Sequence, residues 1–210
     1  MRFSPAALGA ACPDLILGVT FLLVWLEPQR FAPDMIRGLM LLMLLEFIVV
    51  HSGGFAGSVI LSEQPRMQKV KALGGLGLFY TLFVGGFSLV FRTWWPLLSF
   101  WGLMINRMMS VLLGQAEKGD ERAFLQRGWA AGAVFYLLFA FATVLLPVPR
   151  FGLTDEVLRA VDLPGEGLWV DQPWRVLAFG FLYFTATGLS EMRGHQWFAG
   201  GVPARESKAA

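Results

Sequence analysis

Residues 35–61 read MIRGLMLLMLLEFIVVHSGGFAGSVIL, and this stretch decides the fold class of the chain. A bilayer core is crossed by about 20 apolar residues rising 1.5 Å each, so the stretch is long enough to span a membrane. Glu46 falls about 3 Å to the outer side of the helix centre and His51 about 4–5 Å to the inner side. An ionisable group at such a depth is costly, which makes Glu46 a candidate functional residue.

The composition of the whole chain places it outside the range of soluble domains. Of its 210 residues, 56% are hydrophobic and only 15% are charged, whereas about a quarter of the residues in a soluble domain are charged. The class predicted is therefore an all-α integral membrane protein. The net charge of +2 gives no indication of nucleic-acid binding, and the single cysteine, Cys12, has no partner for an internal disulfide.

The apolar segments predict one polytopic domain over residues 1–210, built as a six-transmembrane-helix bundle. The expected spans are residues 13–28, 35–61, 71–91, 94–114, 128–148 and 172–192. Pro13 and Asp14 suit the start of the first helix. The fifth loop, residues 149–171, is expected on the outer side and to contain a short interfacial helix capped by Thr154. Residues 193–210 form a polar tail.

Basic residues in the loops predict the orientation. Ten Lys and Arg residues lie on the side of the two termini and six lie on the opposite side. Because cytoplasmic loops carry the excess of Lys and Arg, both termini and the tail 193–210 are expected in the cytoplasm. The predicted location is the cell inner membrane, and the lipid bilayer is the first expected partner.

Two opposite charges within the predicted spans suggest an intramembrane polar pair. Glu46 and Arg107 lie at compatible depths on helices that run in the same direction, and an unpaired charge costs several kcal/mol in hydrocarbon. We therefore expect an ion pair between them. The pair has two interpretations: a buried bridge that fixes how the second and fourth helices dock, or part of a proton or ion path.

His51 does not share a helix face with Glu46, because five residues at 100° each separate them by about 140°. Gly53 and Gly57 lie on the Glu46 face with the spacing that allows close helix packing. His51 has small residues beside its ring and could ligate a haem or a chlorophyll-type pigment. The alternative is a histidine that forms a hydrogen bond with a neighbouring carbonyl or hydroxyl.

A second polar face lies at the end of the sixth span, where Thr187, Glu191 and His195 follow one another at intervals of four residues. Glu191 and His195 form one possible edge of a metal site, but two ligands do not make a site, so no metal is predicted. The sequence also has no nucleophile elbow, His-Glu-x-x-His motif or phosphate loop, and no catalytic residue or enzymatic activity is predicted.

Three function classes remain. The first is a non-catalytic accessory subunit or assembly factor of a larger membrane complex, with other integral membrane subunits as partners. The second is a small channel or transporter for ions or protons that uses Glu46 and Arg107. The third is a membrane protein that binds haem or pigment through His51.

Overall fold

A computed structural model describes residues 5–114, 119–161 and 163–195 of the chain. All regular secondary structure within these ranges is helical. Six helices have 18 residues or more: α1 (Pro5–Leu26), α2 (Pro33–Leu61), α3 (Arg66–Val90), α4 (Trp95–Leu112), α5 (Gly119–Leu145) and α8 (Pro173–Met192). Short helices lie in the connections: η1 (Pro28–Arg30), α6 (Asp155–Val161) and α7 (Leu168–Asp171).

Four of these helices are long and apolar enough to cross a membrane: α1, α2, α3 and α5. The chain is thus all-helical and suited to a multi-pass membrane protein. Four of the six predicted spans therefore correspond to helices that could cross a membrane. Helices α4 and α8, with 18 and 20 residues, are the two shortest of the six and are not among these four.

The start of α1 differs from the sequence prediction. The helix begins at Pro5, so Pro13 lies inside it and does not mark its beginning. Proline lacks the N–H that would bond to the carbonyl four residues earlier, but membrane helices tolerate this loss. The predicted tail, residues 193–210, lies outside the described residues from position 196 onward.

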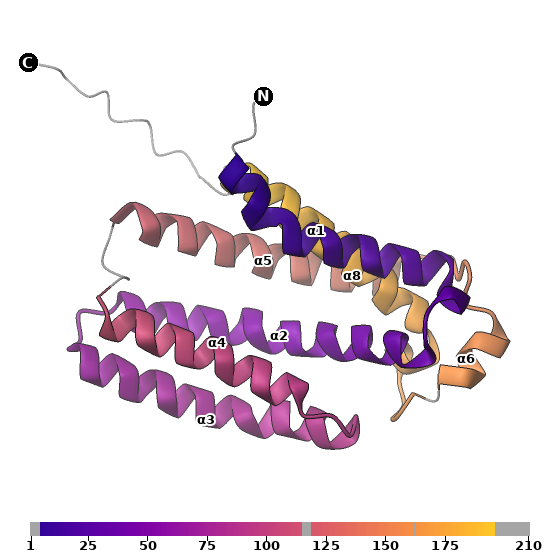
Figure 1. Cartoon of the computed structure of the whole chain (residues 1–210), viewed down its shortest axis with the longest axis horizontal. Helices are drawn as coiled ribbons and strands as arrows, with labels where there is room; N and C mark the ends of the chain where they lie inside the picture. Colours follow the sequence, from indigo (N-terminus) through magenta and orange to yellow (C-terminus); the bar gives the residue numbers. More distant parts are fainter. Residues whose placement is uncertain (1–4, 115–118, 162, 196–210) are drawn as a thin grey trace, which may run out of the picture.

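The long helices form two halves that share α2 (Figure 1). Helix α8 packs along α1 and α5, whereas α3 packs along α4, and α2 contacts members of both groups. Each half has its own buried core. Phe21, Met43 and Phe179 belong to the core of the first half, and Tyr80, Phe100 and Met104 belong to that of the second.

Helices α1 and α8 make the closest approach in the bundle. A Cβ atom added at Gly18 would lie 2.7 Å from Thr185 Oγ1, and one added at Gly188 would lie 2.9 Å from Leu15. At Gly180 it would overlap the ring of Phe21. Small residues let these two backbones approach because no side chain stands between them.

Helix α6 lies in the loop where a short capped helix was predicted. The backbone N–H of Val157 donates to Thr154 Oγ1 at 3.4 Å, which caps the first turn. Val161 is buried, and Val157 and Leu158 pack against the core of the α1–α5–α8 half. The apolar side of α6 is therefore covered by the chain itself.

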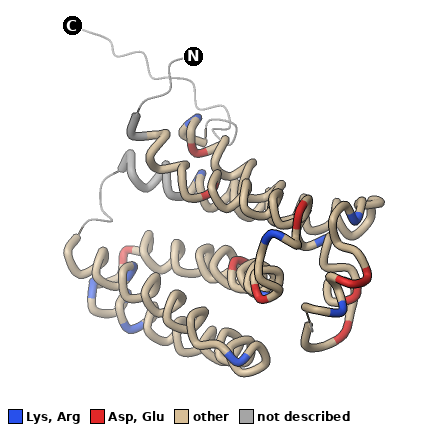
Figure 2. The backbone as a smooth tube through the Cα atoms, turned by 45° about the vertical axis from the view of Figure 1, so that its right-hand side comes forward, with Lys and Arg blue, Asp and Glu red and all other residues tan. Residues whose placement is uncertain are grey.

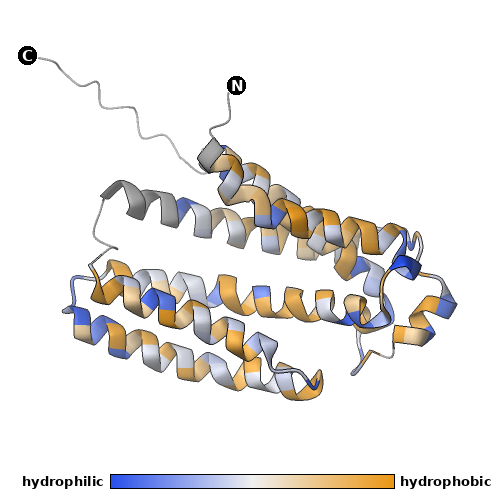
Figure 3. Ribbon diagram, viewed as in Figure 1, coloured by the Kyte–Doolittle hydropathy of each residue, from blue (hydrophilic) through white to orange (hydrophobic). Residues whose placement is uncertain are grey.

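Apolar residues recur along the long helices (Figure 3), and many large apolar side chains are exposed, such as Leu82 at 75% and Leu98 at 72%. Charged residues gather mainly near the helix ends and in the connections (Figure 2). This distribution suits a bundle surrounded by hydrocarbon. The few charged side chains along the helices therefore stand out.

Candidate functional site

Glu46 lies near the middle of α2 and faces α8. The hydroxyl of Tyr183 donates a hydrogen bond of 2.6 Å to Glu46 Oε1. Tyr136 of α5 lies beside this pair, with its ring centroid 5.5 Å from that of Tyr183, and its hydroxyl donates to the carbonyl of Met43 at 2.9 Å. Two buried tyrosines from two other helices therefore enclose the carboxyl group of Glu46.

Further oxygen atoms continue from Glu46 toward the end of the bundle where α1 begins and α8 ends. Asp14, on α1, lies close enough to Glu191, and less closely to Glu46, for their negative charges to repel its own. Thr187 lies between Tyr183 and Glu191 on the same face of α8, and its buried Oγ1 has no hydrogen-bond partner among the described residues. We call Glu46, Tyr183, Thr187, Asp14 and Glu191 the acidic line.

The predicted ion pair between Glu46 and Arg107 is not formed: among the described residues, none of the ion pairs joins these two side chains. The guanidinium of Arg107 lies next to Gly53, where an added Cβ would be 3.5 Å from its Nη2. Gly53 follows Glu46 by seven residues, or about 10 Å along the helix axis. Tyr183 is the partner of Glu46 in place of Arg107.

Of the two predicted packing glycines, only Gly53 lies at a close helix contact. The indole of Trp129, on α5, fits over Gly53 and Gly54, where an added Cβ at Gly54 would lie 2.6 Å from the ring. Trp129 Nε1 also donates to the carbonyl of Val50 at 2.9 Å. A Cβ added at Gly57 has no described atom within 4 Å. The contact between α2 and α5 is therefore made at Gly53 and Gly54, and Gly57 takes no part in it.

His51 faces α3 and is exposed at the surface of the bundle. Its Nδ1 shares a hydrogen bond of 2.6 Å with the hydroxyl of Tyr80. Phe47 and Phe55 flank the imidazole one turn before and one turn after it on α2. His51 and Glu46 therefore have partners in different halves of the molecule.

The proposed metal edge at Glu191 and His195 is divided in the structure. His195 is buried, and its Nδ1 shares a hydrogen bond of 3.0 Å with Ser190 Oγ, while the charge of Glu191 is near that of Asp14, which repels it. Burial lowers the pKa of His195 below its usual value. Within the described part of the chain, no group of three or more His, Cys, Asp or Glu residues could hold a metal ion.

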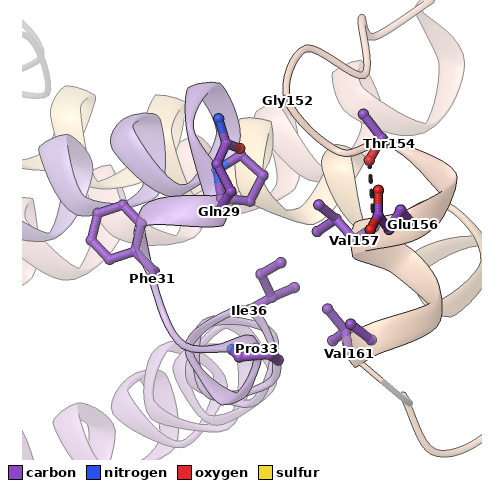
Figure 4. A pocket seen from close by; sticks show the side chains of 11 residues that line it. Gln29, Phe31, Pro33, Ile36, Gly152, Thr154, Glu156, Val157 and Val161 are labelled. Carbon is purple, nitrogen blue, oxygen red and sulfur yellow. Dashed lines mark hydrogen bonds between the residues drawn. The ribbon is translucent and has the colours of Figure 1, made fainter.

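A cavity of about 580 Å³ opens at the end of the bundle that carries α6 (Figure 4). Ile36, Val157 and Val161 turn toward it, with Gln29 and Thr154 nearer its rim. A second cavity of about 380 Å³ lies nearby between α2 and the start of α4, beside Arg37 and Arg92. Neither cavity is lined by Glu46, His51 or Arg107.

Four residues of these sites were not singled out from the sequence: Asp14 as an acid near Glu191 and Glu46, and Tyr80, Tyr136 and Tyr183 as hydrogen-bond partners. A signal for Tyr183 exists, because it precedes Thr187 by four residues and so extends the polar face of the last helix. Tyr80 and Tyr136 have no comparable signal. Their roles depend on which helices pack together.

In comparisons with known proteins, the chain matches no protein-family model, no curated protein and no solved structure. The function must therefore be argued from the chain's own geometry.

Proposed function

We propose that this chain is a non-catalytic, membrane-embedded subunit of a larger complex in the cell inner membrane, with other integral membrane subunits as partners. In this proposal all six long helices span the bilayer. Helices α4 and α8 have 18 and 20 residues, which gives lengths of about 27 and 30 Å, close to the hydrocarbon thickness of about 30 Å. Both pack along helices that are apolar enough to span.

The observation that carries the subunit proposal is the outward face of α3, formed by Gly75, Leu78, Leu82, Gly86 and Leu89. A Cβ added at either glycine meets no atom of the described residues within 4 Å, and the three leucines are 65%, 75% and 66% exposed. Leucine faces lipid as well as protein. Glycine on the same face supports a partner helix, because small residues permit the close approach on which helix association in membranes depends.

A substitution on this face tests the proposal. We expect the wild-type protein to co-purify with larger membrane partners after mild detergent extraction from its native membrane. Gly86→Leu should fold but lose these partners, because the added side chain holds a neighbouring helix away. Gly9→Leu is the matched control, since Gly9 is also open but lies on α1. A wild-type protein that migrates alone, or a Gly86→Leu variant that keeps its partners, contradicts the proposal.

The orientation with both termini in the cytoplasm rests on the excess of Lys and Arg on that side. A fluorescent protein fused to the C-terminus should be bright, and alkaline phosphatase fused at the same position should be inactive. The opposite pattern contradicts this orientation.

The acidic line favours a second candidate function, a path for protons. Glu46 has Tyr183 as its hydrogen-bond partner and forms no ion pair with a described Lys or Arg residue. Acidic residues within membrane-spanning helices are typical of proton relays, and the acidic line contains three of them. Proton flux into vesicles that contain the purified protein should be lost in Glu46→Gln and kept in Asp34→Asn, which changes an acid at the start of the same helix. Equal flux in wild type and Glu46→Gln contradicts this candidate.

A further inference from the structure

His51 is an exposed polar side chain on the surface of a helix that is apolar enough to span a membrane. It lies four residues after Phe47, the central residue of α2, and therefore about 6 Å from the middle of the helix. Its Nδ1 shares a hydrogen bond with the hydroxyl of Tyr80, but its Nε2 has no hydrogen-bond partner among the described residues. A polar nitrogen left without a partner in hydrocarbon is costly, which indicates that a group from outside the chain meets it.

The surroundings of His51 are aromatic and half-exposed. The ring of Phe47 is nearly parallel to the imidazole, with centroids 5.6 Å apart and an interplanar angle of 6°, and Phe55 meets it edge to face at 5.3 Å. Phe79 and Phe83 extend this surface onto α3, where both rings contact that of Tyr80. The four phenylalanines are 45% to 53% exposed. We call these residues with His51 the aromatic surface.

The hydroxyl of Tyr80 lies at Nδ1 of His51, the position at which an oxygen acceptor orients a metal-binding histidine. Such a histidine donates a hydrogen bond from one ring nitrogen to a protein oxygen and binds the metal through the other. When Nδ1–H donates to the Tyr80 hydroxyl oxygen, the lone pair of Nε2 is available. Tyr80 is 2% exposed, so it is held by the core and restricts rotation of the ring.

A metal ion bound by His51 needs further ligands that do not come from the described side chains of the chain. A bare metal ion such as zinc needs three or four protein ligands, and the described residues contain no group of even three suitable acidic, histidine or cysteine side chains. A tetrapyrrole supplies four nitrogen ligands and needs only an axial one from the protein. Its flat, largely apolar ring is also soluble in the bilayer and suits an open aromatic surface without a cavity.

We propose that His51 binds a metal tetrapyrrole through Nε2 as its axial ligand, with the macrocycle against the aromatic surface of α2 and α3. This proposal does not depend on the proton path, since it does not use the acidic line. On α3 the aromatic surface borders the outward face, because Phe79 lies one turn from Gly75 and Leu82, and Phe83 lies one turn from Gly86. The site would hold a prosthetic group although the described side chains contain no group of three or more metal ligands.

Titration of the detergent-purified protein with iron protoporphyrin IX tests the proposal. We expect saturable binding at one haem per chain with a shifted Soret band. His51→Ala should raise Kd by at least about tenfold, and Tyr80→Phe should raise it by about 10- to 100-fold, the usual effect of removing the partner that orients a ligating histidine. His195→Ala, which removes the other histidine of the chain, should bind haem as the wild type does.

A ligand exchange keeps the test decisive if His51→Ala does not fold. His51→Met retains a metal-binding atom at the same position, and its haem complex should have a different Soret maximum from that of wild type. Identical spectra and Kd values for the wild type and a folded His51 variant overturn the proposal. It is also overturned if the protein from its native membrane carries a lipid-soluble quinone in stoichiometric amount and no tetrapyrrole.

Discussion

The two halves of the bundle use glycine in opposite ways. Where α1 meets α8, Gly18, Gly180 and Gly188 lie against neighbouring atoms, and an added Cβ would clash. On α3, Gly77 packs against Met104 and Trp101, but Gly75, Gly85 and Gly86 have no described atom within 4 Å of an added Cβ. The first half also encloses the acidic line, whereas the second presents the aromatic surface. Measured by its interhelical glycines alone, the α1–α5–α8 half is closed within the chain, whereas α3 has an open glycine surface; both halves expose apolar side chains, such as Leu145 of α5 and Leu82 of α3.

The largest effect is expected from a valine placed at a closed glycine. Gly180→Val forces the ring of Phe21 out of its position and should lower the free energy of unfolding by about 3 kcal/mol, the upper range for overpacking a core. Gly85→Val is the matched control and should change it little, because nothing lies within 4 Å of its Cβ position. Thermal stability in detergent, followed by size-exclusion chromatography, measures both. Equal losses in the two variants remove the distinction between the halves.

A smaller effect is expected from removing the hydroxyl group that binds Glu46. Tyr183→Phe leaves the Glu46 carboxyl group without its hydrogen bond of 2.6 Å and should destabilise the protein by about 1–2 kcal/mol. Tyr80→Phe removes a bond of the same length from exposed His51 and should cost less than about 1 kcal/mol. A larger loss of stability in Tyr80→Phe than in Tyr183→Phe would contradict the conclusion that the Glu46 hydrogen bond is the more buried of the two.

Arg107 offers a test across the boundary between the halves. Because Glu46 and Arg107 do not form an ion pair, we expect Glu46→Gln and Arg107→Gln to act independently on stability. The double variant should differ from the sum of the single variants by less than about 0.5 kcal/mol. A coupling energy well above this value in a double-mutant cycle indicates that the two side chains meet in the membrane.

The smallest effect is expected on the pH dependence of stability, through His195, which follows the end of α8. Burial lowers the pKa of His195 in the folded protein, so the unfolded chain takes up this proton first as the pH falls. The stabilising contribution of neutral His195 is complete above the usual value of 6.5 and is lost as the pH falls from there toward the folded pKa. Thermal stability measured from pH 8 to pH 5 should therefore fall less in His195→Gln than in wild type. Parallel curves contradict this role.

The sequence was sufficient for the class of the fold and for its long apolar segments. The run around Glu46 forms one helix, and the capped helix at Thr154 is present, because both depend on local composition and capping. The partner of Glu46 could not be predicted in the same way. Depth along a helix follows from counting residues, and it favoured Arg107, but the direction in which each helix face points depends on which helices are neighbours.

The glycine pattern had the same ambiguity. Gly53 and Gly57 have a spacing typical of close packing, yet one lies under Trp129 and the other has no neighbour. Other close glycine contacts join α1 and α8 at Gly18, Gly180 and Gly188, which belong to the first and last spans. Contacts between segments so distant in sequence are determined by the topology of the whole bundle, which no local motif specifies.

The unequal lengths of two neighbouring helices have a consequence for the membrane itself. With 29 residues α2 measures about 44 Å, whereas α4, with 18 residues, measures about 27 Å. If both cross a hydrocarbon layer of about 30 Å, α2 must tilt or extend beyond it, while α4 stands nearly upright or thins the layer around it. Membrane thickness should therefore affect the α3–α4 half first, and a thinner bilayer should suit that half better than a thick, sterol-rich one.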